Sequence, residues 1–176
     1  LIMIKYIVVT LSLSFSIYAL AQDQNNLVPN SSFESIEGKF KKLKQISAAK
    51  EWSSPTALNA DLFSKKKEGP IGAPVNMYGK EHPKDGDNYA GIVLYSYNNK
   101  TPRTYIQVPL MSALTGGLDY CVKFHISLSD LSKYAVNNIG AHLGVDPLTL
   151  DSKGDIIFNN RKEFSNVVKD ASNKIY

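Results

Sequence analysis

The stretch LDYCVKFHISL, Leu118 to Leu128, carries the clearest structural signal in the chain. Apolar side chains stand at every second position from Tyr120 onward, and mostly polar ones stand between them. Because successive side chains of a β-strand point to opposite faces, this alternation predicts a strand with one face in the core and one wetter face. The sequence Thr115-Gly116-Gly117 is expected to form the turn that begins it.

Turn residues recur about every ten positions on either side of this stretch, with β-branched and aromatic residues between them, a spacing typical of an antiparallel β-sandwich. Helical periodicity is limited to residues 129–137, where we expect a short helix or turn with Leu131, Tyr134 and Ala135 facing inward. The sequence predicts further strands at Asp87 to Tyr97, Arg103 to Leu110, Ile139 to Val145 and Ile156 to Phe158.

The first residues have the layout of a secretory signal. Lys5 precedes an apolar run that ends at Leu20, and small residues stand at positions −3 and −1 of a cleavage site after Ala21. A transmembrane helix is the alternative, but the run has about 15 residues where a span needs about 20. We therefore expect a signal peptide at residues 1–21 and one exported β-sandwich domain at residues 22–176.

Composition limits the classes of partner. The 155 residues after the signal suit one domain with its own core. The formal net charge of +4 falls to +3 when Lys5 is removed. The lysine-rich stretches at 39–44 and 65–67 are expected to be solvated loops, since no aromatic residues alternate with them as nucleic-acid stacking requires. We therefore exclude nucleic acid as a partner.

Cysteine and histidine are too few for the common metal and redox sites. Cys121 is the only cysteine, so the core is expected to hold by packing alone unless a partner cysteine lies outside this sequence. The three histidines, His82, His125 and His142, have no spacing that would place two of them on one helix turn. A zinc site is therefore not expected.

The sequence shows no catalytic constellation. It contains no G-x-S-x-G elbow, and no serine, histidine and acid stand in a pattern typical of a triad. The acids Glu34, Glu37, Asp61 and Asp87 lie in expected loops without a supporting motif, and His125 is expected on a strand surface. We therefore expect a protein that is not an enzyme.

The segment LVPNSSFE, Leu27 to Glu34, resembles the opening motif of galactose-binding-like jelly-roll domains, a group that includes many carbohydrate-binding modules. The resemblance implies that Phe33 anchors the core at the end of a first strand, Val28 to Phe33. It also implies that Glu34 helps to hold a structural calcium ion.

Oxygen-bearing side chains around Gly86 extend that candidate calcium site. Together with Glu34, the side chains of Asp85, Asp87 and Asn88 supply enough oxygen atoms for one ion, which takes about 6 to 8 ligands. The spacing is not that of an EF-hand loop. A turn held by hydrogen bonds and capped by an aspartate is the alternative.

A second resemblance covers nearly the whole chain after residue 21. It rests on Glu51-Trp52 and on residues 53–56, 60–63, 72–79, 86–97, 102–105 and 120–143. These segments look like the N-terminal domain of OmpA-family outer-membrane proteins of Bacteroidota-like bacteria. The resemblance implies a jelly-roll sandwich at the outer membrane, in the periplasm or at the cell surface of a Gram-negative bacterium. It also implies a following C-terminal domain that binds peptidoglycan.

The end of the sequence suggests a truncated jelly roll. Residues 173–176 carry no turn cluster or polar tail, and the last strands of such a fold are not found. The terminal strands of a jelly roll pair with early ones, so we expect an open edge beside the strand at Val28 to Phe33 and a marginally stable fragment.

Aromatic side chains are the candidates for ligand binding. Exposed rings form flat platforms for sugar rings, while nearby polar groups bind hydroxyls. The candidate ligand-binding residues are Trp52, Tyr89, Tyr95, Tyr97, Arg103 and Tyr105. The alternative is that most of these rings pack in the core or at its edge, with their polar atoms toward solvent.

Three functions are compatible with these features. The leading hypothesis is a non-catalytic cell-envelope domain of an OmpA-like outer-membrane protein that binds a glycan or another envelope component. The second is a carbohydrate-binding module of an exported glycoside hydrolase, and the third is a free-standing hydrolase. The sequence identifies neither a ligand nor an oligomeric state.

Overall fold

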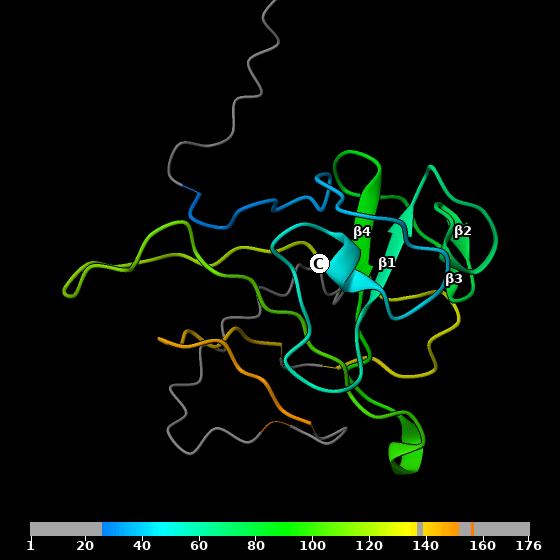
Figure 1. The fold of residues 1–176 in the computed structure, drawn as a ribbon. Coiled ribbons are helices and arrows are strands. Elements are labelled where there is room, and N and C mark those ends of the chain that lie inside the picture. Colours follow the sequence, from blue (N-terminus) through cyan, green and yellow to red (C-terminus); the bar gives the residue numbers. More distant parts are fainter. Residues whose placement is uncertain (1–25, 137–138, 152–155, 157–176) are drawn as a thin grey trace, which may run out of the picture.

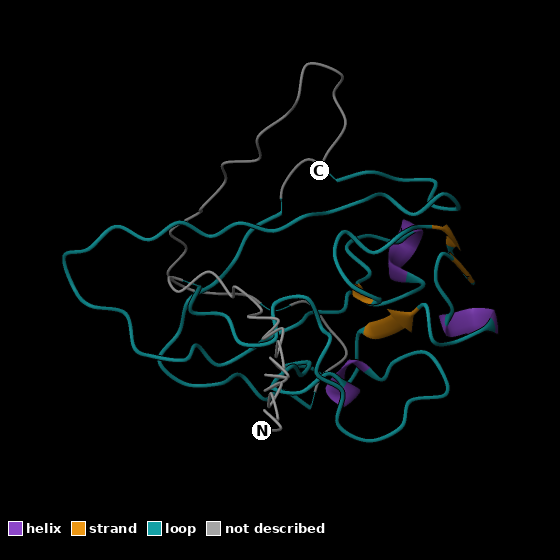
Figure 2. Ribbon diagram, turned by 90° about the horizontal axis from the view of Figure 1, so that it is seen from above, coloured by secondary structure: helices purple, strands orange, loops and turns teal. Residues whose placement is uncertain are grey.

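The computed structural model describes residues 26–136, 139–151 and 156, in which short elements are joined by long loops (Figures 1 and 2). The expected signal peptide at 1–21 lies outside these residues, as do Ile157 and Phe158 of the last expected strand. In chain order the elements are the 3-10 helix η1 (Ile46–Ala48), β1 (Asp61–Ser64), the 3-10 helix η2 (Gly69–Ile71), β2 (Val75–Asn76), β3 (Gly79–Lys80), β4 (Asn88–Gly91) and the 3-10 helix η3 (Tyr97–Asn99).

The described part of the chain is all-β in character. It holds two antiparallel two-stranded sheets, β1 with β4 and β2 with β3, and it contains no α-helix. No helix within the described ranges is long and apolar enough to cross a membrane. The expectation of an antiparallel all-β fold is thus confirmed at this coarse level.

Strand β1 lies at the centre of the fold. All four of its residues are buried, and they pair with β4 from Asp61 opposite Gly91 to Ser64 opposite Asn88. Gly91 lets the Phe63 ring lie against the backbone of β4, because a Cβ atom at position 91 would stand 2.5 Å from that ring. This strand is covered on both faces, which explains its apolar centre Leu62-Phe63.

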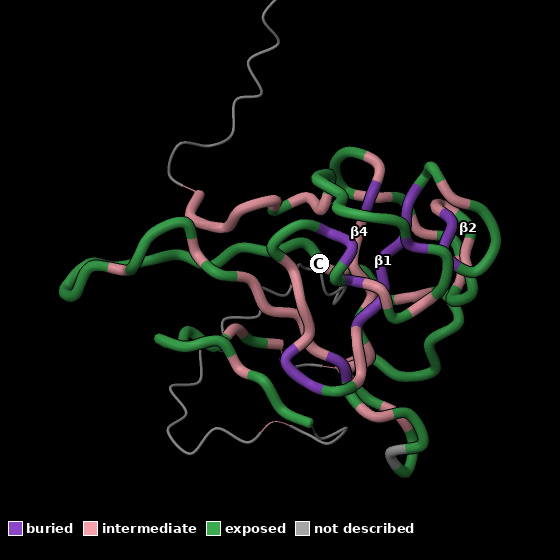
Figure 3. The backbone as a smooth tube through the Cα atoms, in the orientation of Figure 1, coloured by how far each residue is buried: buried purple, intermediate pink, exposed green. Residues whose placement is uncertain are grey.

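The hydrophobic core forms where η1 meets β1. The amide N–H of Ile46 donates to the carbonyl of Ala60 at 3.1 Å, so the 3-10 helix is held at the start of the strand. Figure 3 shows the buried residues gathered around β1 and β4, whereas the long loop at the left of the view is mostly exposed. The core cluster comprises Phe40, Ile46, Ala48, Ala49, Ala60, Leu62 and Ile71.

The hairpin β2–β3 is held by the turn that follows residue 128. Asp130 accepts a hydrogen bond from the amide of Lys80 at 2.8 Å, and the amide of Leu131 donates to the carbonyl of Tyr78 at 3.1 Å. A turn therefore occupies the region where we expected a short helix or turn. Its side chains differ from the prediction, since Leu131 is 69% exposed and Tyr134 is 44% exposed instead of facing inward.

Two expected strands are present in part. Of residues 87–97, the segment Asn88–Gly91 forms β4. Of residues 103–110, two positions form single bridges, Tyr105 with Asn59 and Gln107 with Ser53. The first segment pairs along the whole of β1, and the second bridges to residues that precede β1 in the chain.

The prediction for residues 118–128 is wrong in its main point. The expected turn is present, with the amide of Leu118 donating to the carbonyl of Thr115 at 3.4 Å, but no strand follows. The apolar side chains are exposed rather than buried, with Val122 and Leu128 each 53% exposed. The physical reason is that no described residue makes a backbone hydrogen bond to residues 119–126, so no ladder holds them as a strand.

The expected first strand at residues 28–33 is also wrong, since these residues form a turn. The amide of Phe33 donates to the carbonyl of Asn30 at 2.9 Å, and both residues have positive φ angles, 47° and 63°. The side chain of Asn30 accepts from the amide of Ser35 and donates to the carbonyl of Lys50, so local hydrogen bonds replace a ladder. The open edge expected beside this strand is accordingly not found there.

The expected strand at Ile139 to Val145 is absent as well. None of these seven residues is in a strand, and Val145 is fully exposed. Gly140 and Gly144 weaken the segment because they have no side chain to pack against a neighbour.

Asp61, the first residue of β1, is a buried carboxylate. Its Oδ1 accepts a hydrogen bond from the amide of Lys44 at 2.7 Å, and its side chain is also hydrogen-bonded to Tyr78. Burial raises the pKa of Asp61 and outweighs these hydrogen bonds, which lower it. Burial and the neighbouring Asp61 also raise the pKa of Tyr78.

Replacing Leu62 by alanine should lower the free energy of unfolding by about 2 to 5 kcal/mol, because the substitution leaves a cavity in a fully buried position. Val75→Ala is the matched control. Val75 is 63% exposed, so its loss should change stability by less than about 0.5 kcal/mol. Urea unfolding followed by circular dichroism measures both, and equal effects would contradict a core centred on β1.

Asp61 should make stability depend on pH. Its folded pKa lies above its unfolded value, so the cost of the buried charge is absent at low pH and appears as pH rises through the folded pKa. Asp61→Asn cannot ionise. The variant should therefore gain stability relative to the native chain as pH rises from about 3 to about 7, in urea unfolding series at each pH. If the difference in free energy of unfolding between Asp61→Asn and the native chain stays constant over this pH range, the buried carboxylate does not destabilise the fold.

Candidate functional site

Glu34 lies against the turn at residues 85–88. Its Oε1 accepts hydrogen bonds from the amides of Asp87 and Asn88, both at 2.9 Å. Gly86 has a φ of +65°, and a Cβ atom there would collide with the carboxylate of Glu34. Glycine therefore serves both the left-handed conformation and the close approach of the carboxylate.

Two lysines that follow β1 in the chain contact the same turn. Lys65 donates from Nζ to the carbonyl of Gly86 at 2.7 Å, and Lys66 forms an ion pair with Asp87 at 2.9 Å. The hydrogen bond from Lys66 lowers the pKa of Asp87. The next residue, Lys67, lies with Nζ 4.9 Å from the centre of the Phe40 ring.

These contacts add specific partners to the solvated loop expected at residues 65–67. Lys65 and Lys66 are exposed, yet each has a specific partner about twenty residues away in the chain. A run of like charges carries no information about such partners, so the sequence offered no signal for them.

Glu34 does meet the turn that carries the other three candidate calcium ligands, but the protein itself uses polar atoms of three of the four. Glu34 accepts the backbone amides of Asp87 and Asn88, and Asp87 pairs with Lys66. The side-chain amide of Asn88 donates to the carbonyl of Phe33 at 3.1 Å. Asp85 is exposed. Among the described residues, no group of three or more His, Cys, Asp or Glu side chains could hold a metal ion. The geometry is that of a hydrogen-bonded turn capped by Glu34.

Two of the candidate aromatic residues support the fold. The indole N–H of Trp52 donates to the carbonyl of Asn30 at 2.9 Å, and its ring packs 4.7 Å from that of Phe33. Tyr89 stacks on Phe63 at 5.0 Å, and its hydroxyl accepts from the amide of Asn76 at 2.6 Å. Both rings are half-buried, and each has a neighbouring aromatic ring packed against it.

Three other candidates line one open groove. Tyr95, Arg103 and Tyr105 contribute to a hollow of about 680 Å³. Tyr134, which the sequence did not single out as a binding residue, completes its aromatic surface, with its ring edge-on to that of Tyr95 at 5.0 Å and 74°. The full lining is Ile92, Leu94, Tyr95, Arg103, Thr104, Tyr105, Ile106, Tyr134, Ala135, Val136, Ile139 and Gly140.

Buried hydrogen bonds hold the floor of this groove in place. Thr104 is buried, its amide donates to the carbonyl of Val93 at 3.0 Å, and its hydroxyl accepts from the amide of Val93 at 2.8 Å. The hydroxyl of Tyr105 accepts from the amide of Ile156 at 3.2 Å. Tyr97, the remaining candidate, lies on η3 and is 57% exposed, and it does not line the groove.

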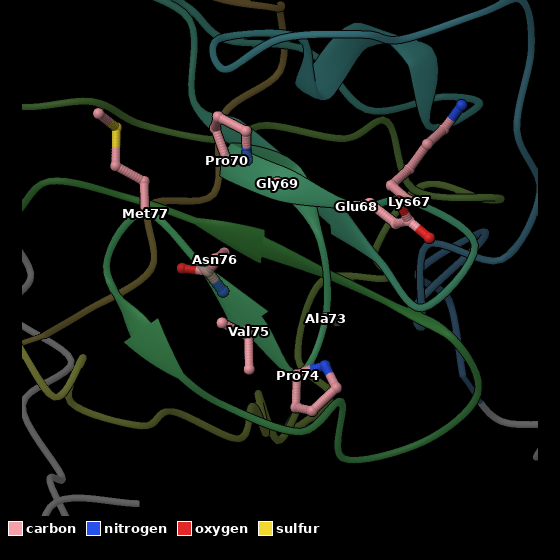
Figure 4. Close-up of a pocket in the computed structure, with 9 residues that line it drawn as sticks. All are labelled: Lys67, Glu68, Gly69, Pro70, Ala73, Pro74, Val75, Asn76 and Met77. Carbon is pink, nitrogen blue, oxygen red and sulfur yellow. The ribbon is translucent and has the colours of Figure 1, made fainter.

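A second hollow of about 510 Å³ lies between η2 and β2 (Figure 4). Its lining includes Pro70, Pro74 and Val75, while Met77 and Lys67 lie at opposite ends of it. The lining is largely apolar and has no aromatic ring, so it has neither a platform nor the convergent polar groups of a specific ligand site.

Comparison of the chain with models of known protein families finds no match, and comparisons with curated proteins and with solved structures find none either. The groove and the turn are therefore interpreted from their own geometry.

Glu34→Ala should destabilise the protein by about 1 to 2 kcal/mol, because two amides of the 85–88 turn lose a charged acceptor near the surface. Glu37→Ala is the control. Glu37 forms only an exposed ion pair with Lys50, so its loss should cost at most about 0.5 kcal/mol. Thermal unfolding measures both, and calcium should leave the native midpoint unchanged. If calcium raises the unfolding midpoint of the native chain and a chelator lowers it, the turn binds calcium and the interpretation as a purely hydrogen-bonded turn is wrong.

Proposed function

We propose that this chain is an exported, non-catalytic jelly-roll β-sandwich of the cell envelope that binds carbohydrate in the groove lined by Tyr95, Arg103 and Tyr105. The groove carries the proposal because it joins ring surfaces to hydrogen-bond donors at one place. Its volume of about 680 Å³ lies within the range of small-molecule sites, about 300 to 1,000 Å³.

The chemistry of the lining favours a sugar over a purely apolar ligand. Tyrosine rings present apolar faces to the C–H groups of a pyranose, and their hydroxyls bind its oxygen atoms. The guanidinium of Arg103 contributes N–H donors in a planar fork, a geometry that suits hydroxyl pairs and carboxylates. The aliphatic residues Ile92, Leu94 and Ile106 add an apolar wall.

The same lining favours binding without hydrolysis. Among the described residues that line the groove, none is Asp, Glu, His or Cys, the usual acids, bases and thiol nucleophiles. The one hydroxyl besides the tyrosines belongs to Thr104, which already accepts a backbone hydrogen bond. A glycosidase requires two carboxylates about the bond it cleaves, and the groove lacks them in this part of the chain.

The cell-envelope assignment rests on the expected signal peptide and on the resemblance to the N-terminal domain of OmpA-family proteins. In that setting a further C-terminal domain would bind peptidoglycan, and this domain would contact a glycan or another envelope component. A carbohydrate-binding module of an exported glycoside hydrolase would use the same groove. The two hypotheses differ in ligand. An OmpA-like envelope domain would bind bacterial envelope glycans, whereas a carbohydrate-binding module would bind the polysaccharide that its enzyme degrades.

Tyr95→Ala should weaken glycan binding by about 1 to 3 kcal/mol, as the loss of a stacking ring commonly does. Tyr97→Ala is the matched control, because it removes a similarly exposed tyrosine outside the groove and should leave affinity unchanged. A glycan array identifies the ligand, and calorimetry with that ligand compares the variants. Equal affinity of the native chain and Tyr95→Ala, with circular dichroism unchanged, would reject the groove.

A further inference from the structure

Two lysine-rich segments that are far apart in the sequence meet in the structure. The Nζ atom of Lys67 lies 4.9 Å from the centre of the Phe40 ring, which is itself buried. This contact brings Lys67 beside residues 38–50, a segment that holds five lysines and no acidic residue. The lysine cluster is defined as Lys39, Lys41, Lys42, Lys44 and Lys67.

Hydrogen bonds fix the backbone that carries these lysines. The side chain of Gln45 accepts the amides of both Lys41 and Lys42 at 2.9 Å, and buried Asp61 accepts the amide of Lys44 at 2.7 Å. Neighbouring lysines of this loop stand one or two residues apart, so their Cα atoms are about 4 to 7 Å from each other. This spacing is below the Debye length of about 8 Å at physiological salt, so their fields add.

Few carboxylates compensate the lysine cluster. Lys39 to Lys44 are exposed at all four lysine positions, and Lys67 is half-buried. The ion pairs found in the described part of the chain join Lys50 to Glu37 and Lys66 to Asp87. Neither pair includes a lysine of the cluster. Against five lysines there are buried Asp61 and exposed Glu68, which follows Lys67, so the cluster has a net positive charge.

The chemistry of the cluster suits an extended anionic surface. Each cation is a lysine, a point charge on a flexible stem, and none is an arginine with a fork for one specific carboxylate. Its one aromatic neighbour, Phe40, is only 3% exposed and offers no ring for a sugar or a base to stack on. Neither of the two hollows described above is lined by residues 39–44.

We propose that the lysine cluster binds an anionic lipid surface through the phosphate groups of the lipid headgroups. Clustered lysines bind such surfaces by electrostatic attraction, without a shaped pocket. The apolar residues of the loop do not take part, because Phe40 belongs to the core and Leu43 packs against it. This interaction is separate from the proposed glycan groove, which none of the five lysines lines.

The test is co-sedimentation of the 176-residue chain with lipid vesicles. Vesicles that contain about one-third phosphatidylglycerol should bind the protein in about 0.1 M salt. Binding should be lost as salt rises to about 0.5 M, because the Debye length shrinks from about 10 Å to about 4 Å. Vesicles of pure phosphatidylcholine measure any attachment through the apolar run at residues 6–20, which all variants share.

Removal of charge within the cluster is the decisive change. The double variant Lys41→Gln, Lys42→Gln should bind the anionic vesicles about 30-fold more weakly, since each lysine at such a surface contributes about a fivefold factor. The matched control is Lys100→Gln, Lys133→Gln, which removes the same charge from exposed positions outside the cluster and should weaken binding less than about threefold. The double variant Lys41→Arg, Lys42→Arg should bind as the native chain does, because it keeps the charge.

Three results would overturn the proposal. Equal losses in the two glutamine double variants, with circular dichroism unchanged, would show that binding follows net charge and not the cluster. Equal binding of the native chain to neutral and anionic vesicles would show that residues 6–20 alone attach it. Absence of binding to the anionic vesicles would overturn it as well, and retention of the chain by soluble polygalacturonate in that case would assign the cluster to acidic polysaccharides.

Discussion

The burial of β1 on both faces is the constraint on which the other contacts depend. A strand of four residues has few ladder bonds of its own, so its position is stable only because neighbours close around it. β4 pairs along one edge, η1 is hydrogen-bonded to the residue just before the strand, and Asp61 at its start accepts the amide of Lys44. The Phe63 ring, held between β1 and the glycine of β4, completes this centre.

Outside that centre, hydrogen bonds from polar side chains hold several turns in place. Asn30 holds the opening turn through its amide group, and Glu34 holds the turn before β4 through its carboxylate. Each of these side chains replaces backbone ladder bonds that a longer strand would provide. A structure dominated by loops can satisfy its backbone groups in this way, because the same side chain can accept or donate two bonds at once.

The groove and residues 119–126 differ in how far the described residues satisfy their backbone groups. The groove combines exposed rings with buried Thr104, which is joined to Val93 by two hydrogen bonds. Residues 119–126 have exposed apolar side chains and free backbone groups, so a regular strand there requires a partner. The first feature suits recognition of a small rigid ligand.

The sequence by itself determined the features that depend on neighbouring residues. Alternation and turn residues indicated an antiparallel all-β chain, the turn at Thr115 to Leu118 followed from its glycines, and Glu34 was correctly grouped with residues 85–88. The tertiary structure alone decided which extended segments find a partner, because ladder bonds join residues far apart in the chain. For that reason residues 88–91 became a strand, while the more regular alternation of residues 118–128 did not. Long-range packing also separated the aromatic candidates, since it half-buries Trp52 and Tyr89 and leaves Tyr95 exposed.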